Sequence, residues 1–349
     1  MRALRLSILL VSWLLTSLAG VNALAQEASS AAEPAYDQDA DGESRAKKAA
    51  NGLLGRPAPA LTLKTIDGES IDLLSLYGRK PVYFKFWATW CVPCRQQMPG
   101  FEDIYQKYGD DIEVIAVNTG FNDSEAAIRE YTQKITMSMP IVVDDGTLGS
   151  QLNLQVTPMH VLVGRDGRVV YVGHIDGPRL ERAIKAVMAE VPDATVDASA
   201  PTQTRQLAVG DTVANISLTT LSGKKVALGT SDKPQALMFF APWCESYLAE
   251  SRPAMAANCA RIRKQVETLV KKSNYAWYGV SSNLWVRRDE VEAYRQETNT
   301  ELPLAYDGSG ELFRAFAVRD IPTIVLIKPD GTVTKIIGPD TQNIAAAIK

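Results

Sequence analysis

Two stretches of the chain place cysteine in a frame that could do thiol chemistry. Residues 90–94 are Trp-Cys-Val-Pro-Cys, whereas residues 243–247 are Trp-Cys-Glu-Ser-Tyr. Two cysteines separated by two residues can pass electrons by forming and breaking their own disulfide. The second stretch has Tyr247 where the second cysteine would stand. Only the first stretch can therefore complete such a cycle alone.

Thiol-disulfide exchange is favoured when the attacking cysteine lies at the turn between a strand and a helix. A buried apolar strand is predicted at residues 82–87, directly before the first frame, and a helix with a proline in its early turns follows it. The free N–H groups and the dipole of a helix N-terminus favour a thiolate. We expect Cys91 to be the nucleophile and Cys94, one turn deeper, to resolve the mixed disulfide.

The elements around the first frame recur in the same order around the second. Each half contains a turn, a buried strand, Trp-Cys, a helix, a second strand, a second helix, and a proline that opens a strand before an Asp-Gly turn. This order predicts a parallel crossover unit followed by an antiparallel pair, which is a mixed-sheet α/β domain present twice. The predicted strands are residues 82–87, 113–118, 236–240 and 276–281. Extra residues between Cys244 and Ala276 are expected to lengthen the helix and loop there.

The chain divides into five segments by composition. Residues 1–25 combine two arginines, an apolar run and a small-x-small cleavage site, which predicts a removable export signal. The apolar run is shorter than the roughly 20 apolar residues that a membrane-spanning helix needs, which argues against an uncleaved membrane anchor. Residues 26–50 are rich in Ala, Ser, Glu and Asp and are predicted to be a flexible leader. A polar linker at 193–206 separates a catalytic domain at 51–192 from a degenerate domain at 207–349.

Charge and cysteine content exclude several classes of protein. The chain has 37 Lys and Arg against 40 Asp and Glu, so no basic field exists to hold nucleic acid or anionic lipid. Four cysteines are too few for a fold held together mainly by disulfides. A length of 349 residues with 46% hydrophobic composition is enough for two domains, each with its own core.

Residues 86–95, together with Thr157 and Pro158, resemble the active-site region of the thioredoxin-like exported reductases of the TlpA, ResA and DsbE type. The resemblance covers about residues 52–190 and, more weakly, residues 207–349. It implies two tandem thioredoxin folds. It also implies a cis peptide bond before Pro158 and a Thr157 backbone that pairs with the client.

The residues beside the cysteines have supporting roles in this interpretation. Trp90 would shape the contact surface, and Pro93 would stiffen the turn and remove one N–H donor.

Two residues depart from the family pattern. Gln97 stands where the family usually has a glutamate, and Lys85 stands where thioredoxins have a buried aspartate. A charged Lys85 would favour the thiolate and a neutral one could accept a proton, unless its side chain reaches solvent or pairs with a carboxylate.

The second half leaves Cys244 without a neighbouring partner, and Cys259 is the remaining thiol. On an unbroken helix the two cysteines would lie about 22 Å apart, which is too far for a disulfide. A break in the helix near Pro253 would allow the bond, so both possibilities stay open.

Other residues of the second half keep parts of the family pattern. Glu250 falls where the family glutamate belongs, and Pro322 follows Ile321 as Pro158 follows Thr157. This half could be a substrate-docking module, a noncatalytic spacer or dimerisation domain, or a partner that exchanges with Cys91.

The sequence therefore predicts an exported, periplasmic thiol-disulfide oxidoreductase that acts on protein thiols and disulfides. The resemblance favours reduction, with a membrane-bound electron donor. We expect no stable membrane insertion, because the apolar run near the N-terminus is short, and no cofactor or metal beyond the Cys91–Cys94 dithiol. The rival is a protein that binds Cu(I) or a client without turnover, with Met159 and His160 as possible further ligands. Otherwise, His160 and His174 are expected to be ordinary strand residues.

Overall fold

The computed structural model describes residues 37–190, 196, 198–199 and 205–349. The predicted signal peptide and residues 26–36 of the predicted leader lie outside this part of the chain. The chain from Gln38 to Lys349 forms one compact unit. Within the described residues, no helix combines the length and the apolar character that crossing a membrane requires.

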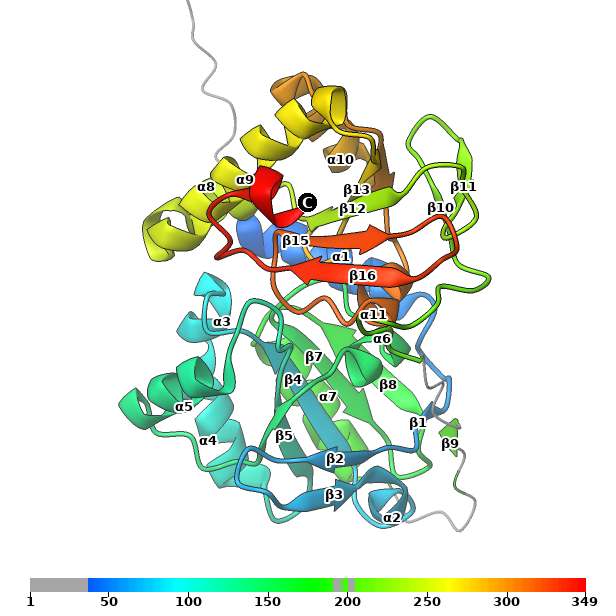
Figure 1. Cartoon of the computed structure of the whole chain (residues 1–349). Coiled ribbons are helices and arrows are strands. Elements are labelled where there is room, and N and C mark those ends of the chain that lie inside the picture. The colour runs from blue at the N-terminus through cyan, green and yellow to red at the C-terminus, as the bar shows by residue number, and fades with distance from the viewer. Residues whose placement is uncertain (1–36, 191–195, 197, 200–204) are drawn as a thin grey trace, which may run out of the picture. The chain divides into compact units, whose positions relative to one another are not determined.

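The first domain is built on a five-stranded mixed sheet in the order β6-β5-β4-β7-β8 (Figure 1). The strands β4, β5 and β6 are parallel, and β7 and β8 are antiparallel to their neighbours. Their bounds are β4 Val82–Trp87, β5 Glu113–Asn118, β6 Ile141–Val143, β7 Met159–Val163 and β8 Val169–Gly173. The bounds of β4 and β5 confirm the sequence prediction, whereas the edge strand β6 was not anticipated.

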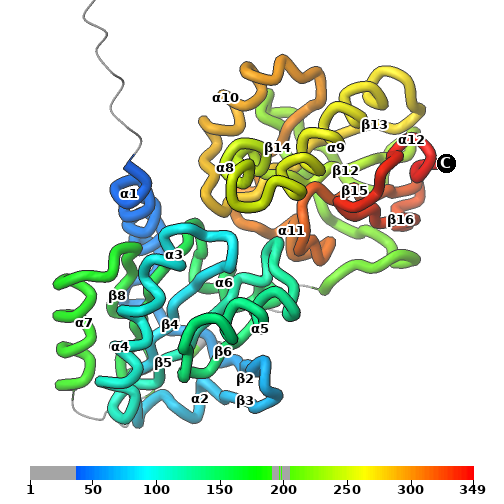
Figure 2. The backbone as a smooth tube through the Cα atoms, turned by 90° about the vertical axis from the view of Figure 1, so that its left-hand side faces the viewer, coloured from blue at the N-terminus to red at the C-terminus, as the bar shows by residue number. Residues whose placement is uncertain are grey.

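Three helices cover one face of this sheet, and Figure 2 shows them side by side. They are α4 (Met98–Tyr108), α5 (Glu125–Lys134) and α7 (Pro178–Met188). The ring of Phe101 in α4 meets Tyr83 edge-on at 5.4 Å, and Tyr131 in α5 lies 5.6 Å from Trp87. Because side chains alternate along a strand, Lys85 shares this face with Tyr83 and Trp87. The cysteine-bearing helix α3 (Val92–Gln96) leads directly into α4.

The opposite face packs against α1 (Gln38–Ala50), α2 (Leu73–Leu76) and α6 (Thr147–Gln151). A two-stranded hairpin precedes β4 and consists of β2 (Thr62–Lys64) and β3 (Ser70–Asp72). The turn expected before the buried strand lies at Asp67-Gly68, between these two strands.

The prediction of a flexible leader is wrong for its last part, because residues 38–50 form α1. Ala46 and Ala49 are fully buried against the sheet, and Arg45 is buried beside its ion-pair partner Asp41. Glu43 accepts a hydrogen bond from the backbone N–H of His174 at 2.9 Å. A buried face made of alanines and an arginine gives no apolar periodicity, and this hid the helix at the level of sequence.

Part of the predicted linker is also ordered. Residues 198–199 form β9 (Ala198–Ser199), which pairs in parallel with β1 (Ala58–Pro59) of the first domain. The pairing returns the chain to the first domain before the second one begins.

The second domain repeats the fold with a sheet in the order β14-β13-β12-β15-β16. Its strands are β12 Gln235–Phe240, β13 Ala276–Ser281, β14 Leu304–Tyr306, β15 Thr323–Ile327 and β16 Val333–Ile337. The hairpin β10 (Ser217–Thr219) and β11 (Lys225–Ala227) precedes the sheet. The mixed-sheet α/β domain predicted twice is thereby confirmed, with β13 at its predicted bounds and β12 one residue longer.

The helices of the second domain explain its greater length. They are α8 Cys244–Ser251, α9 Pro253–Lys272, α10 Arg288–Thr298, α11 Glu311–Ala315 and α12 Ile344–Ala347. The 20 residues of α9 compare with 11 in its counterpart α4. The extra residues therefore lie in the helix between Cys244 and β13, as the sequence predicted.

Candidate active site

Cys91 and Cys94 are joined in a disulfide at the turn between β4 and α3. Their Sγ atoms lie 2.02 Å apart and their Cα atoms 5.2 Å apart. Cys91 is the N-cap of α3, and its sulfur accepts a hydrogen bond from the Cys94 N–H at 3.2 Å. Such a donor stabilises negative charge on sulfur once the pair is reduced. Pro93 lies in the first turn of α3 and is buried.

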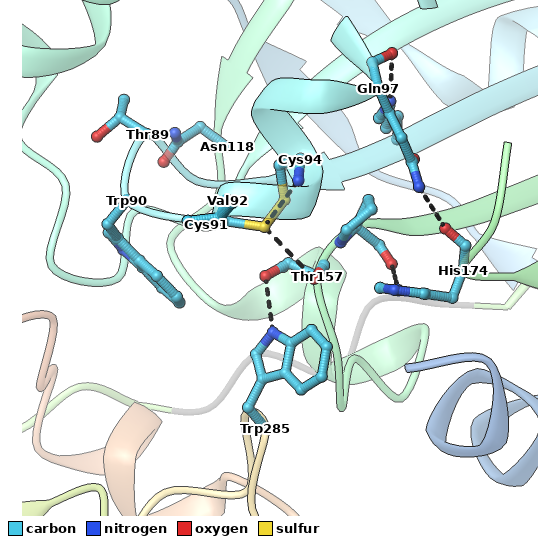
Figure 3. Close-up of a disulfide and its surroundings, with 12 residues drawn as sticks. Thr89, Trp90, Cys91, Val92, Cys94, Gln97, Asn118, Thr157, His174 and Trp285 are labelled. Atoms are coloured by element: carbon cyan, nitrogen blue, oxygen red, sulfur yellow. Dashed lines mark hydrogen bonds between the residues drawn. A yellow bond between two sulfur atoms is a disulfide. The ribbon is translucent and has the colours of Figure 1, made fainter. Parts of the chain in front are cut away.

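The Thr157–Pro158 peptide bond is cis and lies next to the dithiol. The Sγ atom of Cys91 is 3.4 Å from the carbonyl oxygen of Thr157. Figure 3 shows Thr157 between the disulfide and the indole of Trp285. The structure therefore brings together the two cysteines, Thr157 and Pro158, which the resemblance had placed in one site.

Lys85 lies under the site without contact to solvent, so the alternative that it reaches solvent is wrong. Its Nζ donates to the carbonyl oxygen of Gln97 at 3.1 Å and lies 5.0 Å from the centre of the Phe101 ring. Burial lowers the pKa of Lys85 to about 7, and the charge of Asp176 opposes this shift only in part. Near neutral pH, Lys85 can therefore hold or release a proton.

Gln97 and two buried histidines form a polar network that sequence reasoning missed. His160 donates from Nε2 to Gln97 Oε1 at 3.0 Å and accepts at Nδ1 from the Tyr83 hydroxyl at 2.7 Å. His174 lies just after β8, and its Nδ1 donates to the carbonyl oxygen of Pro158 at 2.7 Å. Burial lowers the pKa of both histidines, so each is neutral at pH 7. The network supports the cis-proline from behind the dithiol.

These hydrogen bonds argue against His160 as a ligand in the alternative Cu(I) site. Both ring nitrogens of His160 are used by Tyr83 and Gln97, so the ring offers no lone pair to a metal in this arrangement. Across the described residues, His, Cys, Asp and Glu side chains form no group of three that could hold a metal ion.

The helix of the second domain breaks at Arg252, and this break allows the second disulfide. Cys244 in α8 and Cys259 in α9 are bonded, with their Cα atoms 6.2 Å apart. Both are buried. The Cys244–Cys259 disulfide, which the sequence left open, therefore forms because the helix is broken. Glu250 is exposed on α8 and takes no part in either cysteine site.

Tyr247 stands in the second domain where Cys94 stands in the first, and its hydroxyl has a partner in the first domain. The Tyr247 oxygen accepts a hydrogen bond from the Val92 N–H at 3.1 Å. Trp243 stacks on Trp90 with ring centres 5.1 Å apart. These contacts cover the dithiol, and Cys91 is only 1% exposed. In this structure Trp90 therefore contacts the second domain.

A charged contact reinforces this surface. Arg252 forms an ion pair with the buried carboxylate of Asp123 at 3.2 Å and also hydrogen-bonds Thr89. Asp123 accepts from the Thr89 N–H at 2.6 Å and from the Asn118 side chain at 2.9 Å. Nothing in the local sequence indicates that Asp123 has a partner 129 residues away.

The fold and the site define two tandem thioredoxin-fold domains, the first with a redox-capable dithiol. The AhpC/TSA family model matches residues 54–172 and again residues 209–336. These matches span more than half of the chain, and the protein belongs to the AhpC/TSA family.

Known relatives match about one domain of the chain. The thioredoxin-like protein YneN of Bacillus subtilis is 33% identical over 133 residues, which is 37% of this chain and 78% of YneN. The thiol-disulfide oxidoreductase ResA of Bacillus cereus is 31% identical over 119 residues, or 34% of this chain and 67% of ResA. A solved structure, the exposed lipoprotein thioredoxin Etrx1 of Streptococcus pneumoniae, is 26% identical, with a TM-score of 0.34 over 36% of this chain and 98% of its own.

Proposed function

We propose that the protein is an exported thiol-disulfide oxidoreductase that reduces disulfides of protein clients through Cys91 and Cys94. The observation that carries the proposal is the position of Cys91, which caps α3 with its sulfur 3.4 Å from the carbonyl oxygen of Thr157, next to cis-Pro158. The relatives named as thiol-disulfide oxidoreductases support the same chemistry.

The exchange proceeds in two steps that balance in atoms and electrons. The Cys91 thiolate attacks one sulfur of the client disulfide, forms a mixed disulfide, and releases the other client sulfur as a thiolate. The Cys94 thiolate then attacks Cys91 Sγ, which forms the Cys91–Cys94 disulfide and releases the second client thiolate. Two electrons reach the client, and the two thiolates take up protons according to their pKa values and the pH.

Each nearby group has a role in this scheme. The N–H of Cys94 stabilises the Cys91 thiolate, and Lys85 supplies positive charge or accepts a proton beneath the pair. No cofactor other than the dithiol is needed. A new cycle requires a donor of two electrons, and we assign this role to a membrane-bound dithiol donor facing the periplasm.

Trapping the mixed disulfide tests the proposal. Cys94→Ser removes the thiol that clears the intermediate, so incubating this reduced variant with insulin is expected to accumulate a covalent adduct. Peptide mapping by mass spectrometry under non-reducing conditions should place the adduct on Cys91. Wild-type protein is the control and should show little adduct. An adduct on Cys244 or Cys259, or none with Cys94→Ser, would contradict the proposal.

A further inference from the structure

Each domain contributes one loop that contacts the other domain, and the two loops occupy equivalent positions in the two folds. The first loop, residues 119–123, follows β5, and the second, residues 282–286, follows β13. Each is held by the tryptophan of its own domain's cysteine frame. Trp90 donates from Nε1 to the carbonyl oxygen of Phe121 at 2.7 Å, and Trp243 donates to that of Leu284 at 2.8 Å. We call residues 282–286 the Trp285 loop.

The Trp285 loop lies along the residues that lead to the catalytic cis-proline. The Asn283 side chain donates to the Leu154 carbonyl at 3.4 Å, and the Trp285 N–H donates to the Gln155 carbonyl at 2.9 Å. The indole Nε1 of Trp285 donates to Thr157 Oγ1 at 3.2 Å (Figure 3). One main-chain bond, with a side-chain bond on either side of it, therefore holds the Trp285 loop against residues 154–157.

The first domain makes the same contact in return. The Asn122 N–H donates to the Arg319 carbonyl at 2.8 Å, and the Ile321 N–H donates to Asn122 Oδ1 at 2.9 Å. Ile321 precedes cis-Pro322 as Thr157 precedes cis-Pro158. The proline groove of the second domain is therefore filled by the first domain and is closed to an external substrate in this state.

Trp285 is held in a backbone conformation that its side chain disfavours. Its φ is +57°, and Asn122 at the equivalent position has a φ of +54°. Asparagine tolerates this left-handed region, whereas a bulky aromatic residue rarely adopts it. Such a conformation persists only where its surroundings fix it. Here they include the hydrogen bonds to Gln155 and Thr157, an edge-on contact with His174 at 5.6 Å, and the guanidinium of Arg45 5.8 Å from the ring centre.

The position of Trp285 conflicts with client binding. Thr157 provides the carbonyl 3.4 Å from Cys91 Sγ and also the hydroxyl that the indole occupies. A protein segment carrying a disulfide must bring its sulfur to Cys91, which is 1% exposed, and must lie along the same edge. The segment and the Trp285 loop cannot occupy this edge together.

We propose that the Trp285 loop is an internal competitor for the client, so that a polypeptide disulfide is reduced only after this loop leaves residues 154–157. The inference rests on the proposed function for its physiological meaning, but the occupied edge is a property of the structure alone. The partner that displaces the loop is an extended polypeptide segment next to a disulfide. A small reagent needs less of the edge and is expected to reach Cys91 with a smaller opening.

Alkylation of Cys91 tests the competitor without requiring turnover. The test uses the reduced full chain and compares iodoacetamide with a maleimide attached to a large polymer, with Cys91 modification followed by mass spectrometry. Trp285→Asn keeps the left-handed backbone acceptable and removes the indole. It is expected to speed polymer-maleimide alkylation by about tenfold, because the indole hydrogen bond to Thr157 and the ring contacts with His174 and Arg45 are lost. Iodoacetamide should show a smaller change.

Two further variants sharpen the test. Trp285→Phe keeps a ring but loses the Thr157 hydrogen bond, and an increase of about threefold is expected, because one net hydrogen bond is lost. This conservative variant decides the question if Trp285→Asn does not fold. Trp277→Phe is the matched control, since the Trp277 indole bonds Ser273 inside the second domain, and it should leave both alkylation rates unchanged.

The outcomes separate the competitor from the proposed function. Unchanged polymer-maleimide rates in a folded Trp285 variant would overturn the competitor, even if wild-type protein reduces insulin. Faster alkylation together with faster insulin reduction supports both proposals. Faster alkylation in a protein that never reduces insulin supports the competitor and counts against the proposed function.

Discussion

Replacing Cys91 with serine is expected to reduce the rate of insulin-disulfide reduction by on the order of a thousandfold or more, as loss of a covalent nucleophile does. A serine hydroxyl stays protonated at neutral pH and cannot form a disulfide with a client sulfur. Turbidity of the precipitating insulin chains, with dithiothreitol as the electron source and its uncatalysed rate subtracted, measures this loss.

The second disulfide provides the matched control. Changing Cys244 and Cys259 to serine together removes two buried cysteines from the same chain but leaves Cys91 and Cys94 in place. This double variant is expected to keep its activity at a temperature where it remains folded. If the Cys91→Ser variant still reduced insulin while the double variant did not, the catalytic roles of the two domains would have to be reversed.

Replacing Lys85 with methionine is expected to stabilise the protein at neutral pH. Burial lowers the pKa of Lys85 from 10.5 to about 7, so the unfolded chain binds this proton more tightly than the folded one. The free energy of unfolding of the wild type should therefore rise between about pH 7 and pH 10.5 through this group. At pH 7 the methionine variant should be more stable by on the order of 3 kcal/mol, and the difference should shrink as the pH rises.

Urea unfolding at several pH values measures this difference. Lys134→Met is the control, because Lys134 is exposed on α5 and its change should alter stability by about 0.5 kcal/mol or less. A Lys85→Met variant that is less stable than wild type at pH 7 would contradict the assigned cost of burial.

The same variant separates a structural role of Lys85 from a catalytic one. If the buried amine acts on the dithiol, the pH midpoint of Cys91 alkylation in Lys85→Met should move upward, because positive charge beneath the thiolate is lost. An unchanged alkylation profile would remove Lys85 from the exchange mechanism and leave the stability prediction intact.

The parts of the structure that depend on local pattern were predictable from sequence. The apolar runs at 82–87 and 276–281 form fully or largely buried strands at those bounds. Cys91 and Cys94 lie at a strand-to-helix turn because a buried strand precedes them and Pro93 favours the first turn of a helix. The repeat of these signals was sufficient to predict two domains of one fold.

Other features depend on distant contacts and have no local signature. The Tyr247 hydroxyl meets Val92 across 155 residues, and Trp285 meets Thr157 across 128. In the sequence, Tyr247 indicated only a lost cysteine. The buried surface of α1 is made of small residues and Arg45, a pattern without apolar periodicity that resembles a flexible leader. In each of these cases the structure depends on contacts with residues far away in the sequence.

The reduction potential of the Cys91–Cys94 pair tests most directly whether this dithiol donates electrons to its clients. Equilibrating the wild-type protein in dithiothreitol or glutathione redox buffers, and quantifying the oxidised fraction by mass spectrometry after alkylation, gives this value. We expect a potential more negative than about −200 mV, on the reducing side of protein disulfide isomerase. A potential near −120 mV, typical of a strong oxidant, would contradict the assignment as a reductase.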